Sequence, residues 1–231
     1  MQNYKKIRTS AKMFAYIINF YYLCSIILRD LPMKNIVFDF GGVLMLHNAE
    51  GRMAAFRQFM SDDAIFRVLG LGNKDGRTLA RLFDAGEIDT AAFLRQVLEH
   101  SRPGTTDRMI IDAWNIMHAG IPDDTWMKLR LLKSKGYHLT LMSNTNEIHW
   151  AHTQSLYRDL LDECFEAIFL SFREHCAKPD EAFFRRVNSA IHAVPDETFF
   201  VDDLAVNRDA ARNSVRWLPC ADMEELMEKI I

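Results

Sequence analysis

The chain has 231 residues, of which 49% are apolar, and it carries a formal net charge of −3. This length suits one large domain or a core with a modest insertion, and the apolar fraction is enough to bury a substantial core. The near-neutral charge gives no electrostatic case for binding nucleic acid. The cysteines form no zinc-binding pattern and are expected to be free thiols in a reducing cytosol. They are Cys24, Cys164, Cys176 and Cys220.

The first 32 residues differ in character from the rest of the chain. Four basic residues precede an apolar run over residues 13–28, as in a signal sequence or a membrane anchor. The run is short for a membrane span, which needs about 20 residues, and Asn19 interrupts it. Three interpretations stay open: an upstream extension outside the fold, an amphipathic helix or anchor, and a signal peptide. We expect a cytoplasmic protein that does not associate with membranes unless residues 1–32 are an anchor.

A short apolar run at residues 35–38 is predicted to form a buried strand. Asp39 follows it directly, and Gly41 and Gly42 come next. A carboxylate at the end of a buried strand is costly unless it is paired or binds a metal. The glycines let the backbone turn sharply and approach a ligand closely. Asp39 is therefore a catalytic candidate, although a strand that ends in an Asx turn would look the same.

Residues from 48 to 118 carry apolar side chains at helical spacing. One example of this spacing is the run Ile110, Ala113, Trp114 and Met117. An all-helical stretch inside a pattern of alternating strands and helices indicates an inserted subdomain. We therefore predict a core made of residues 33–47 and 119–231, and an inserted helical segment, residues 48–118.

Beyond residue 118, strands and helices alternate. Strands are expected at residues 137–142, 167–170, 198–201 and 215–218. Helices are expected at about residues 122–135, 150–161, 180–191, 205–212 and 221–230. Repeated strand–helix units predict a parallel sheet with helices on both faces. The predicted fold class is α/β, with a Rossmann-like parallel sheet core and an inserted all-helical segment.

Polar side chains follow several of these later strands. Ser143 and Asn144 come after the strand at residues 137–142, and Lys178 stands just before a helix. The acid pair Asp202-Asp203 follows the strand at residues 198–201. Ligands bind at the carboxyl ends of the strands in open α/β sheets. Alone, Lys178 would pass for a surface lysine, but the whole series in this order is much more specific.

The order of these motifs resembles that of the haloacid dehalogenase superfamily of hydrolases, most of which are phosphatases. The resemblance runs from about Met33 to the C-terminus, and implies that the helical segment is a mobile cap over the active site. Within the superfamily, the chain resembles the bacterial α-D-glucose-1-phosphate phosphatase branch. The stretches that carry this finer resemblance are Asp39-Phe40-Gly41-Gly42-Val43, Ser143-Asn144-Thr145-Asn146, Ala177-Lys178-Pro179-Asp180, and Asp202-Asp203 followed by Asn207.

The resemblance implies a role for each matching residue. Asp39 would be the nucleophile, Ser143 would bind phosphate through its hydroxyl, and Lys178 would hold the phosphate and balance the charge of Asp39. A magnesium ion would be bound by Asp39, Asp203 and the backbone carbonyl of Gly41, because Mg²⁺ prefers hard oxygen ligands.

Other candidates lie close to these positions in the sequence. The backbone of Asn144 is suited to hydrogen-bond phosphoryl oxygens. Asp202 could bind the metal through water or orient Lys178, and Asn207 could help to hold the acidic loop. His47 is a candidate proton donor. A bare pair such as His149 and His152 is a weak zinc signal, so surface or packing roles are expected for both.

Position 41 is the main departure from the superfamily pattern. Many phosphatases of the superfamily carry a second Asp there, two residues after the nucleophile, as general acid and then base. Gly41 has no proton to give, and the α-D-glucose-1-phosphate phosphatase branch also tends to lack this acid. The sequence therefore predicts slow hydrolysis of ordinary alkyl phosphates.

We predict a magnesium-dependent phosphatase that acts on small sugar phosphates or similar metabolites through an aspartyl-phosphate on Asp39. One alternative is a 2-haloacid dehalogenase, which the acid pair disfavours because that chemistry needs no metal. Another is a catalytically weak phosphate-binding or regulatory protein, which Gly41 keeps open. The expected partner is a small phosphorylated metabolite and not nucleic acid, and the expected state is a monomer or homodimer.

Overall fold

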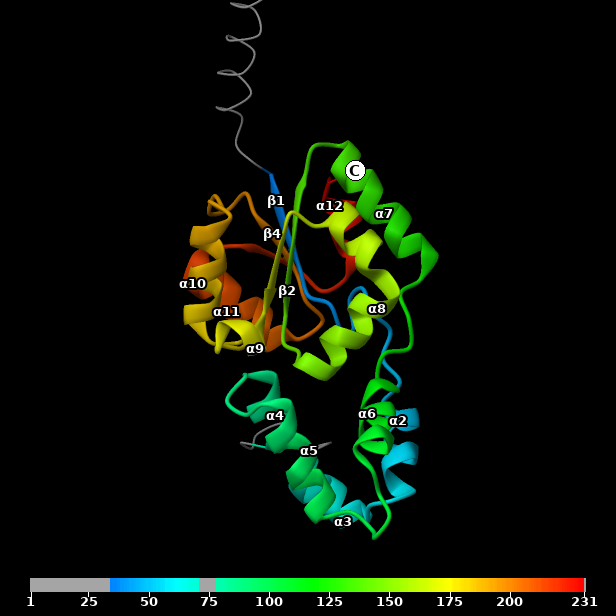
Figure 1. The fold of residues 1–231 in the computed structure, drawn as a ribbon. Helices are drawn as coiled ribbons and strands as arrows, with labels where there is room; N and C mark the ends of the chain where they lie inside the picture. Colours follow the sequence, from blue (N-terminus) through cyan, green and yellow to red (C-terminus); the bar gives the residue numbers. More distant parts are fainter. Residues whose placement is uncertain (1–33, 71–77, 231) are drawn as a thin grey trace, which may run out of the picture. The chain divides into compact units, whose positions relative to one another are not determined.

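The structure is a computed structural model that describes residues 34–70 and 78–230. Figure 1 shows its ribbon. The predicted extension, residues 1–32, lies outside the described residues, so the interpretations of that stretch stay predictions. Within the described ranges, none of the helices combines the length and the apolar character that a membrane crossing requires.

The centre of the fold is a parallel sheet of five strands in the order β3-β2-β1-β4-β5. The strands are β1 (Asn35–Phe38), β2 (His138–Ser143), β3 (Ala167–Leu170), β4 (Phe199–Val201) and β5 (Leu218–Cys220). The predicted α/β fold with a parallel sheet is confirmed. β1 lies in the middle, and its last residue, Phe38, is in register with Leu141 on one side and Val201 on the other. The polar residues that follow β1, β2 and β4 therefore meet at one edge of the sheet.

Helices cover both faces of the sheet, as expected from the alternation. The helices of the core are α7 (Asp123–Ser134), α8 (Glu147–Cys164), α9 (Ser171–Glu174), α10 (Glu181–Ala190), α11 (Ala205–Val215) and α12 (Met223–Ile230). Figure 1 shows α10 and α11 on one side of the sheet and α7 and α8 on the other. Successive side chains of a strand point to opposite faces. Ile36 and Phe38 accordingly join the apolar cluster of α7, α8 and α12, while Val37 joins that of α10 and α11.

The last strand differs from its predicted bounds. It was expected at residues 215–218, but α11 continues to Val215 and β5 begins only at Leu218. Arg216 ends the helix in the left-handed conformation, with φ 57°. Pro219 lies within β5, which is an edge strand, and edge strands tolerate a residue without a backbone N–H.

The helical segment contains α2 (Ala49–Arg57), α3 (Asp62–Ala64), a π-helical turn (Ile65–Leu69), α4 (Leu79–Asp84), α5 (Thr90–Glu99) and α6 (Asp107–Asn115). Side chains of Ser61, Asp89 and Thr106 cap three of these helices by accepting backbone hydrogen bonds. Buried aromatic rings fill the interior, and those of Phe83 and Phe93 stack with centroids 4.4 Å apart. The exact division into core and cap stays a prediction.

The end of α4 approaches the core very closely. The Ser171 hydroxyl donates a hydrogen bond to the Asp84 carbonyl, and Nδ1 of His175 lies 3.1 Å from the Gly86 carbonyl oxygen. Gly86 has φ +67°, and a Cβ atom built on it would lie 2.2 Å from the Phe172 carbonyl oxygen. Only glycine fits at this position. Because it has no side chain, the end of α4 can lie directly against the backbone of Phe172.

We predict that Gly86→Ala destabilises the protein more than Gly104→Ala does. Both glycines have positive φ, but a Cβ at Gly104 would meet nothing within 4 Å. Gly104→Ala should therefore cost only the backbone strain, about 1–2 kcal/mol, whereas Gly86→Ala adds a backbone clash and should cost about 2–4 kcal/mol. The free energy of unfolding from chemical denaturation measures both. Equal losses would show that the contact with Phe172 does not constrain the fold.

Candidate active site

A cavity of about 310 Å³ opens at the carboxyl ends of β1, β2 and β4. Most of the predicted site residues line it: Asp39, Gly41, His47, Ser143, Asn144, Lys178, Asp203 and Asn207. Asp202 is fully buried and is not among the lining residues. The sheet topology therefore brings together side chains that are up to 168 positions apart in the sequence, from Asp39 to Asn207.

Lys178 stands at the centre of this group. Its Nζ lies 2.8 Å from Oδ1 of Asp39 and 2.7 Å from Oδ2 of Asp202, and the residue is only 5% exposed. The side chain of Asn144 fixes the backbone of Lys178 on both sides. Its Nδ2 donates to the Lys178 carbonyl at 2.8 Å, and its Oδ1 accepts from the Lys178 N–H at 2.8 Å. Asn144 thus has a positioning role that the sequence did not suggest.

The carboxylate oxygens of Asp202 accept hydrogen bonds from other groups of the protein. Besides Lys178, it accepts hydrogen bonds from the Leu204 N–H at 2.9 Å and from Nδ2 of Asn207 at 3.0 and 3.1 Å. Of the two roles left open for Asp202, this geometry favours the orientation of Lys178. Asn207 in turn holds Asp202, so its contacts fit the predicted role in the acidic loop.

Burial and charge pairing together set the pKa values of Asp39 and Lys178. Burial raises the pKa of Asp39 to about 6, although the Lys178 ammonium opposes this shift. For Lys178, burial alone would lower the pKa, but Asp39 and Asp202 outweigh it and raise the pKa above its ordinary value. Lys178 is therefore a permanent cation between two carboxylates.

Three carboxylates are close enough to share a metal ion. Asp39, Asp202 and Asp203 each offer an oxygen atom, and these atoms lie within 4.8 Å of one another. Asp203 is exposed, and a Cβ on Gly42 would lie 2.7 Å from its Oδ2, so the glycine admits this side chain beside the loop after β1. The donor set consists of oxygen atoms alone, which fits Mg²⁺. Because Asp202 is already saturated, Asp39 and Asp203 are the carboxylates suited to hold it.

The imidazole of His47 occupies the space that a side chain at position 41 would fill. A Cβ atom built on Gly41 would lie 2.3 Å from Nε2 of His47. The missing carboxylate of position 41 is thus replaced in space by the imidazole of a residue six positions later. Burial lowers the pKa of His47, and Asp203 opposes this shift.

Comparison with known proteins identifies the family. The model of the haloacid dehalogenase-like hydrolases matches residues 33–214. The chain belongs to this family. It is therefore a hydrolase of the haloacid dehalogenase type, as its motifs predicted.

Individual relatives agree with this assignment. A D-ribitol-5-phosphate phosphatase of Bacteroides thetaiotaomicron is 29% identical over 181 residues, which cover 76% of this chain and 85% of that protein. A haloacid dehalogenase family enzyme of the same organism, solved in complex with magnesium and inorganic phosphate, is 27% identical with a TM-score of 0.71. The match covers 81% of this chain and 93% of that one. A predicted haloacid dehalogenase-like family hydrolase of Porphyromonas gingivalis shares the fold, with a TM-score of 0.75 at 23% identity, over 86% of this chain and 98% of that one. The finer resemblance to the α-D-glucose-1-phosphate phosphatase branch stays a prediction.

The helical segment contributes cavity residues that sequence reasoning missed in this hydrolase. Arg52, Asp84 and His118 all line the cavity. Each lies on or beside a helix that the sequence predicted from the spacing of its apolar residues. That spacing does not show which polar side chain faces the cavity. His149 also lines the cavity; it is buried, and its Nε2 donates to the Trp114 carbonyl at 3.0 Å.

The histidines on this wall are neutral at pH 7. Burial lowers the pKa of His118 to about 4, with His47 and His152 adding to the shift. Burial also holds the pKa of His149 well below its ordinary value. Arg52 is therefore the residue that brings positive charge to this side of the cavity.

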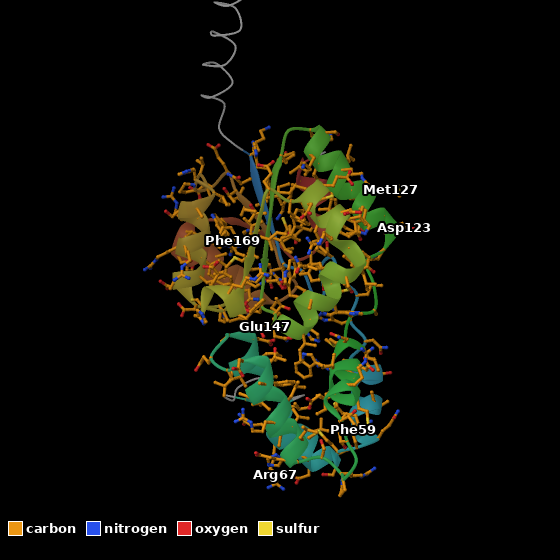
Figure 2. The ribbon with its side chains drawn as sticks, viewed as in Figure 1. Phe59, Arg67, Asp123, Met127, Glu147 and Phe169 are labelled. Atoms are coloured by element: carbon orange, nitrogen blue, oxygen red, sulfur yellow. The ribbon has the colours of Figure 1, made fainter. Side chains whose placement is uncertain are left out.

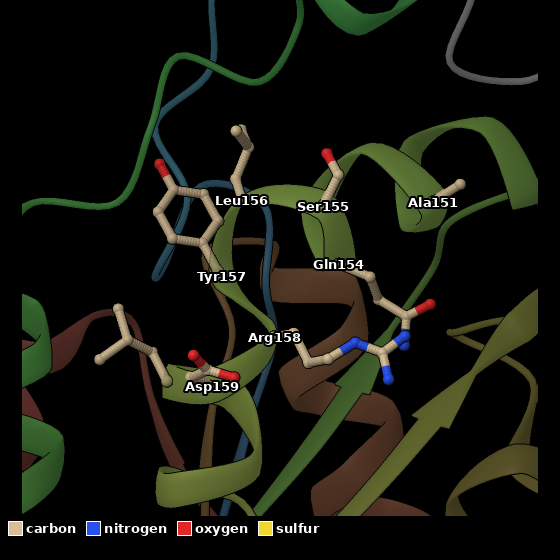
Figure 3. A pocket seen from close by; sticks show the side chains of 8 residues that line it. Ala151, Gln154, Ser155, Leu156, Tyr157, Arg158 and Asp159 are labelled. Carbon is tan, nitrogen blue, oxygen red and sulfur yellow. The ribbon is translucent and has the colours of Figure 1, made fainter.

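A second hollow, of about 800 Å³, lies along α8 (Figure 3). It holds none of the predicted site residues. Its lining comes from one helix, residues 151 and 154–160. This hollow is therefore not part of the candidate site.

We predict that Asp84→Asn stabilises the protein at neutral and higher pH. Burial raises the pKa of Asp84 to about 6 from its ordinary value of 3.8, so ionising this carboxyl costs the folded state free energy. The neutral carboxyl stabilises the folded state fully when the pH is below the pKa of Asp84 in the unfolded chain. This stabilisation is lost as the pH rises through the pKa of Asp84 in the folded protein. Because Asp84 is half-buried, we expect a gain of about 1–2 kcal/mol near pH 8 and almost none near pH 4.

The free energy of unfolding as a function of pH tests this expectation. Asp159→Asn, at an exposed position of α8, controls for the loss of one negative charge. A gain for Asp84→Asn that does not change with pH would contradict the assigned cause.

Proposed function

We propose that this hydrolase is a Mg²⁺-dependent phosphatase of small sugar or sugar-alcohol phosphates that acts through an aspartyl-phosphate on Asp39. The observation that carries the proposal is the Lys178 ammonium, held between Asp39 and Asp202 at the wall of a cavity that also presents Ser143 and Asp203. The name of the relative that hydrolyses D-ribitol-5-phosphate supports the substrate class. The magnesium and phosphate complex of the solved relative supports the metal.

The first step is the attack of Asp39 on the phosphorus atom. Oδ1 of Asp39 is engaged by the Phe40 N–H at 2.7 Å and by Lys178 at 2.8 Å. Oδ2 is therefore the oxygen left to form the new P–O bond. The ester P–O bond breaks, and the departing oxygen takes up a proton from the His47 imidazolium or from water, so that an alcohol leaves. The Phe40 N–H and the Lys178 ammonium thus fix the plane of the Asp39 carboxylate before the substrate binds.

The phosphoryl group must be neutralised before a carboxylate can approach it. Lys178 supplies a positive charge that burial and pairing keep in place. The Ser143 hydroxyl and the backbone N–H of Asn144, at the end of β2, are suited to donate hydrogen bonds to the phosphoryl oxygens. Bound Mg²⁺, held by Asp39, Asp203 and the Gly41 carbonyl, would add charge neutralisation and orientation of the phosphoryl group.

The second step is the attack of water on the phosphorus atom of the aspartyl-phosphate. The attacking water gives a proton to the His47 imidazole. The bond between phosphorus and the Asp39 oxygen breaks, which releases inorganic phosphate and regenerates the carboxylate. Position 41 has no carboxyl group to assist either proton transfer, and the His47 imidazole fills that space instead. His47 is thus our candidate for moving the proton at this position.

We predict that Asp39→Asn abolishes turnover and leaves the fold intact. The amide has nearly the same shape as the carboxylate but is a far weaker nucleophile. Initial rates on a phosphate ester, with a thermal melt beside them, measure the two effects. A variant that kept more than a few per cent of the wild-type rate would rule out Asp39 as the nucleophile.

We also predict that a chelator removes the activity and that Mg²⁺ restores it. Asp203→Asn should raise the Mg²⁺ concentration needed for half-maximal activity steeply, by about tenfold or more, because a metal-binding carboxylate is lost. Asp209→Asn is the matched control, since Asp209 is exposed on the neighbouring α11. Full activity in the presence of chelator would contradict the proposal and favour the dehalogenase alternative.

A further inference from the structure

We infer that Arg52 and Asp84 together select the substrate. They would do so by binding neutral hydroxyl groups on the alcohol portion of the phosphate ester, which is the leaving group. This inference rests on the proposed phosphatase function. Both residues come from the helical segment and line the same cavity as Asp39 and Lys178. The phosphoryl group would occupy the sheet side of that cavity, and the hydroxylated chain would reach the opposite wall.

Asp84 is held in place by Asn146, which is fully buried. Nδ2 of Asn146 donates to Oδ1 of Asp84 at 2.7 Å. Oδ1 of Asn146 accepts from Nε1 of Trp114 at 3.3 Å and from the His149 N–H at 3.0 Å. Asn146 therefore ties α6, α8 and the end of α4 together and fixes the direction of the Asp84 side chain.

The Asp84 carboxylate keeps free acceptor capacity. Among the residues that the structure describes, its side chain accepts no hydrogen bond other than that from Asn146. An ionised carboxylate has about four lone-pair sites. Burial raises the cost of leaving these sites unused, so a ligand that donates hydrogen bonds to Asp84 would recover free energy.

Arg52 offers the complementary donors. Its guanidinium lies over the Trp114 ring, with the central carbon 5.4 Å from the ring centroid. Its Nε is buried and has no hydrogen-bond partner among the described residues. No ion pair to Asp84 is formed within the part of the chain that the structure describes, although the two charges interact. A buried donor without a partner is rare in folded proteins. In this inference, the hydroxyl groups of the ligand supply acceptors for the Arg52 guanidinium.

The charges on this wall favour a neutral ligand. Arg52 and Asp84 have opposite signs, and the neighbouring His118 and His149 are neutral. A second phosphate or a carboxylate would be attracted to Arg52 but repelled by Asp84. A hydroxyl group both donates and accepts hydrogen bonds, so a chain of hydroxyls satisfies both residues. The cavity of about 310 Å³ is at the small end of the range for ligand sites, which suits a short polyol or sugar.

The test compares three phosphate esters with the same number of carbon atoms. Xylitol 5-phosphate carries hydroxyls along the chain, pentyl phosphate carries none, and 5-phosphooxypentanoate ends in a carboxylate. The readout is the ratio of kcat/KM for the xylitol ester to that for the pentyl ester. We expect wild type to favour the xylitol ester by about a hundredfold, since a site built for hydroxyls rejects a chain that lacks them.

Asp84→Asn and Arg52→Met should each lower this ratio by about ten- to hundredfold. Arg67→Met and Asp159→Asn are the matched controls and should leave the ratio unchanged. Arg67 lies at the end of the helical segment that is far from the sheet (Figure 2), and both control residues are exposed. If Arg52→Met does not fold, Asp84→Asn still decides, because it removes a charge without changing shape.

Three results would overturn the inference. They are a wild-type ratio near one, an unchanged ratio in Asp84→Asn, and a preference for the carboxylate ester. In each of these cases the hydrolysis of some ester still supports the proposed function. If wild type hydrolysed none of the three esters, the proposed function would fail, and this inference with it.

Discussion

The site depends on one buried interaction, the ammonium of Lys178 between the carboxylates of Asp39 and Asp202. Removing one partner of such a buried group typically costs about 3–5 kcal/mol, because the remaining charge is left unpaired. The protein therefore surrounds it with supports: Asn144 holds the Lys178 backbone, and Asn207 holds Asp202. With Asp202 committed to Lys178, Asp39 and Asp203 remain for chemistry at the cavity wall.

The sheet topology makes this interaction possible. β1 is paired with β2 on one side and β4 on the other, so Asp39, Ser143 and the acid pair leave the sheet at the same edge. The helical segment then faces this edge with a second set of polar groups around Asn146. Gly86 and Ser171 seat the segment so closely that Asp84 reaches the cavity. In the proposed function, one wall of the cavity carries the phosphoryl chemistry, and the other carries groups suited to the rest of the substrate.

The two walls were not equally predictable from the sequence. The strand ends were visible because short apolar runs stop abruptly at Asp39, Ser143 and Asp202, and strand order alone brings these ends together. Arg52 and Asp84 gave no such signal. They lie on helices whose orientation is set by long-range contacts, such as that of Asn146 with Trp114, which no local pattern encodes. The boundary of β5 was missed for a similar reason, since the extra turn of α11 depends on how Arg216 ends the helix. The sequence also did not show that the His47 imidazole fills the space beside Gly41, because this depends on the conformation of the loop between them.

The proposed function requires that Asp39 carries the phosphoryl group during turnover. The most direct measurement is to quench the enzyme during turnover of a phosphate ester, reduce it with borohydride and sequence its peptides by mass spectrometry. An aspartyl-phosphate is an acyl phosphate, and its reduction leaves homoserine. We expect homoserine at position 39 when substrate is present, and unmodified aspartate there when it is absent. Homoserine at Asp203 or another carboxylate, with Asp39 unchanged during measurable turnover, would contradict it.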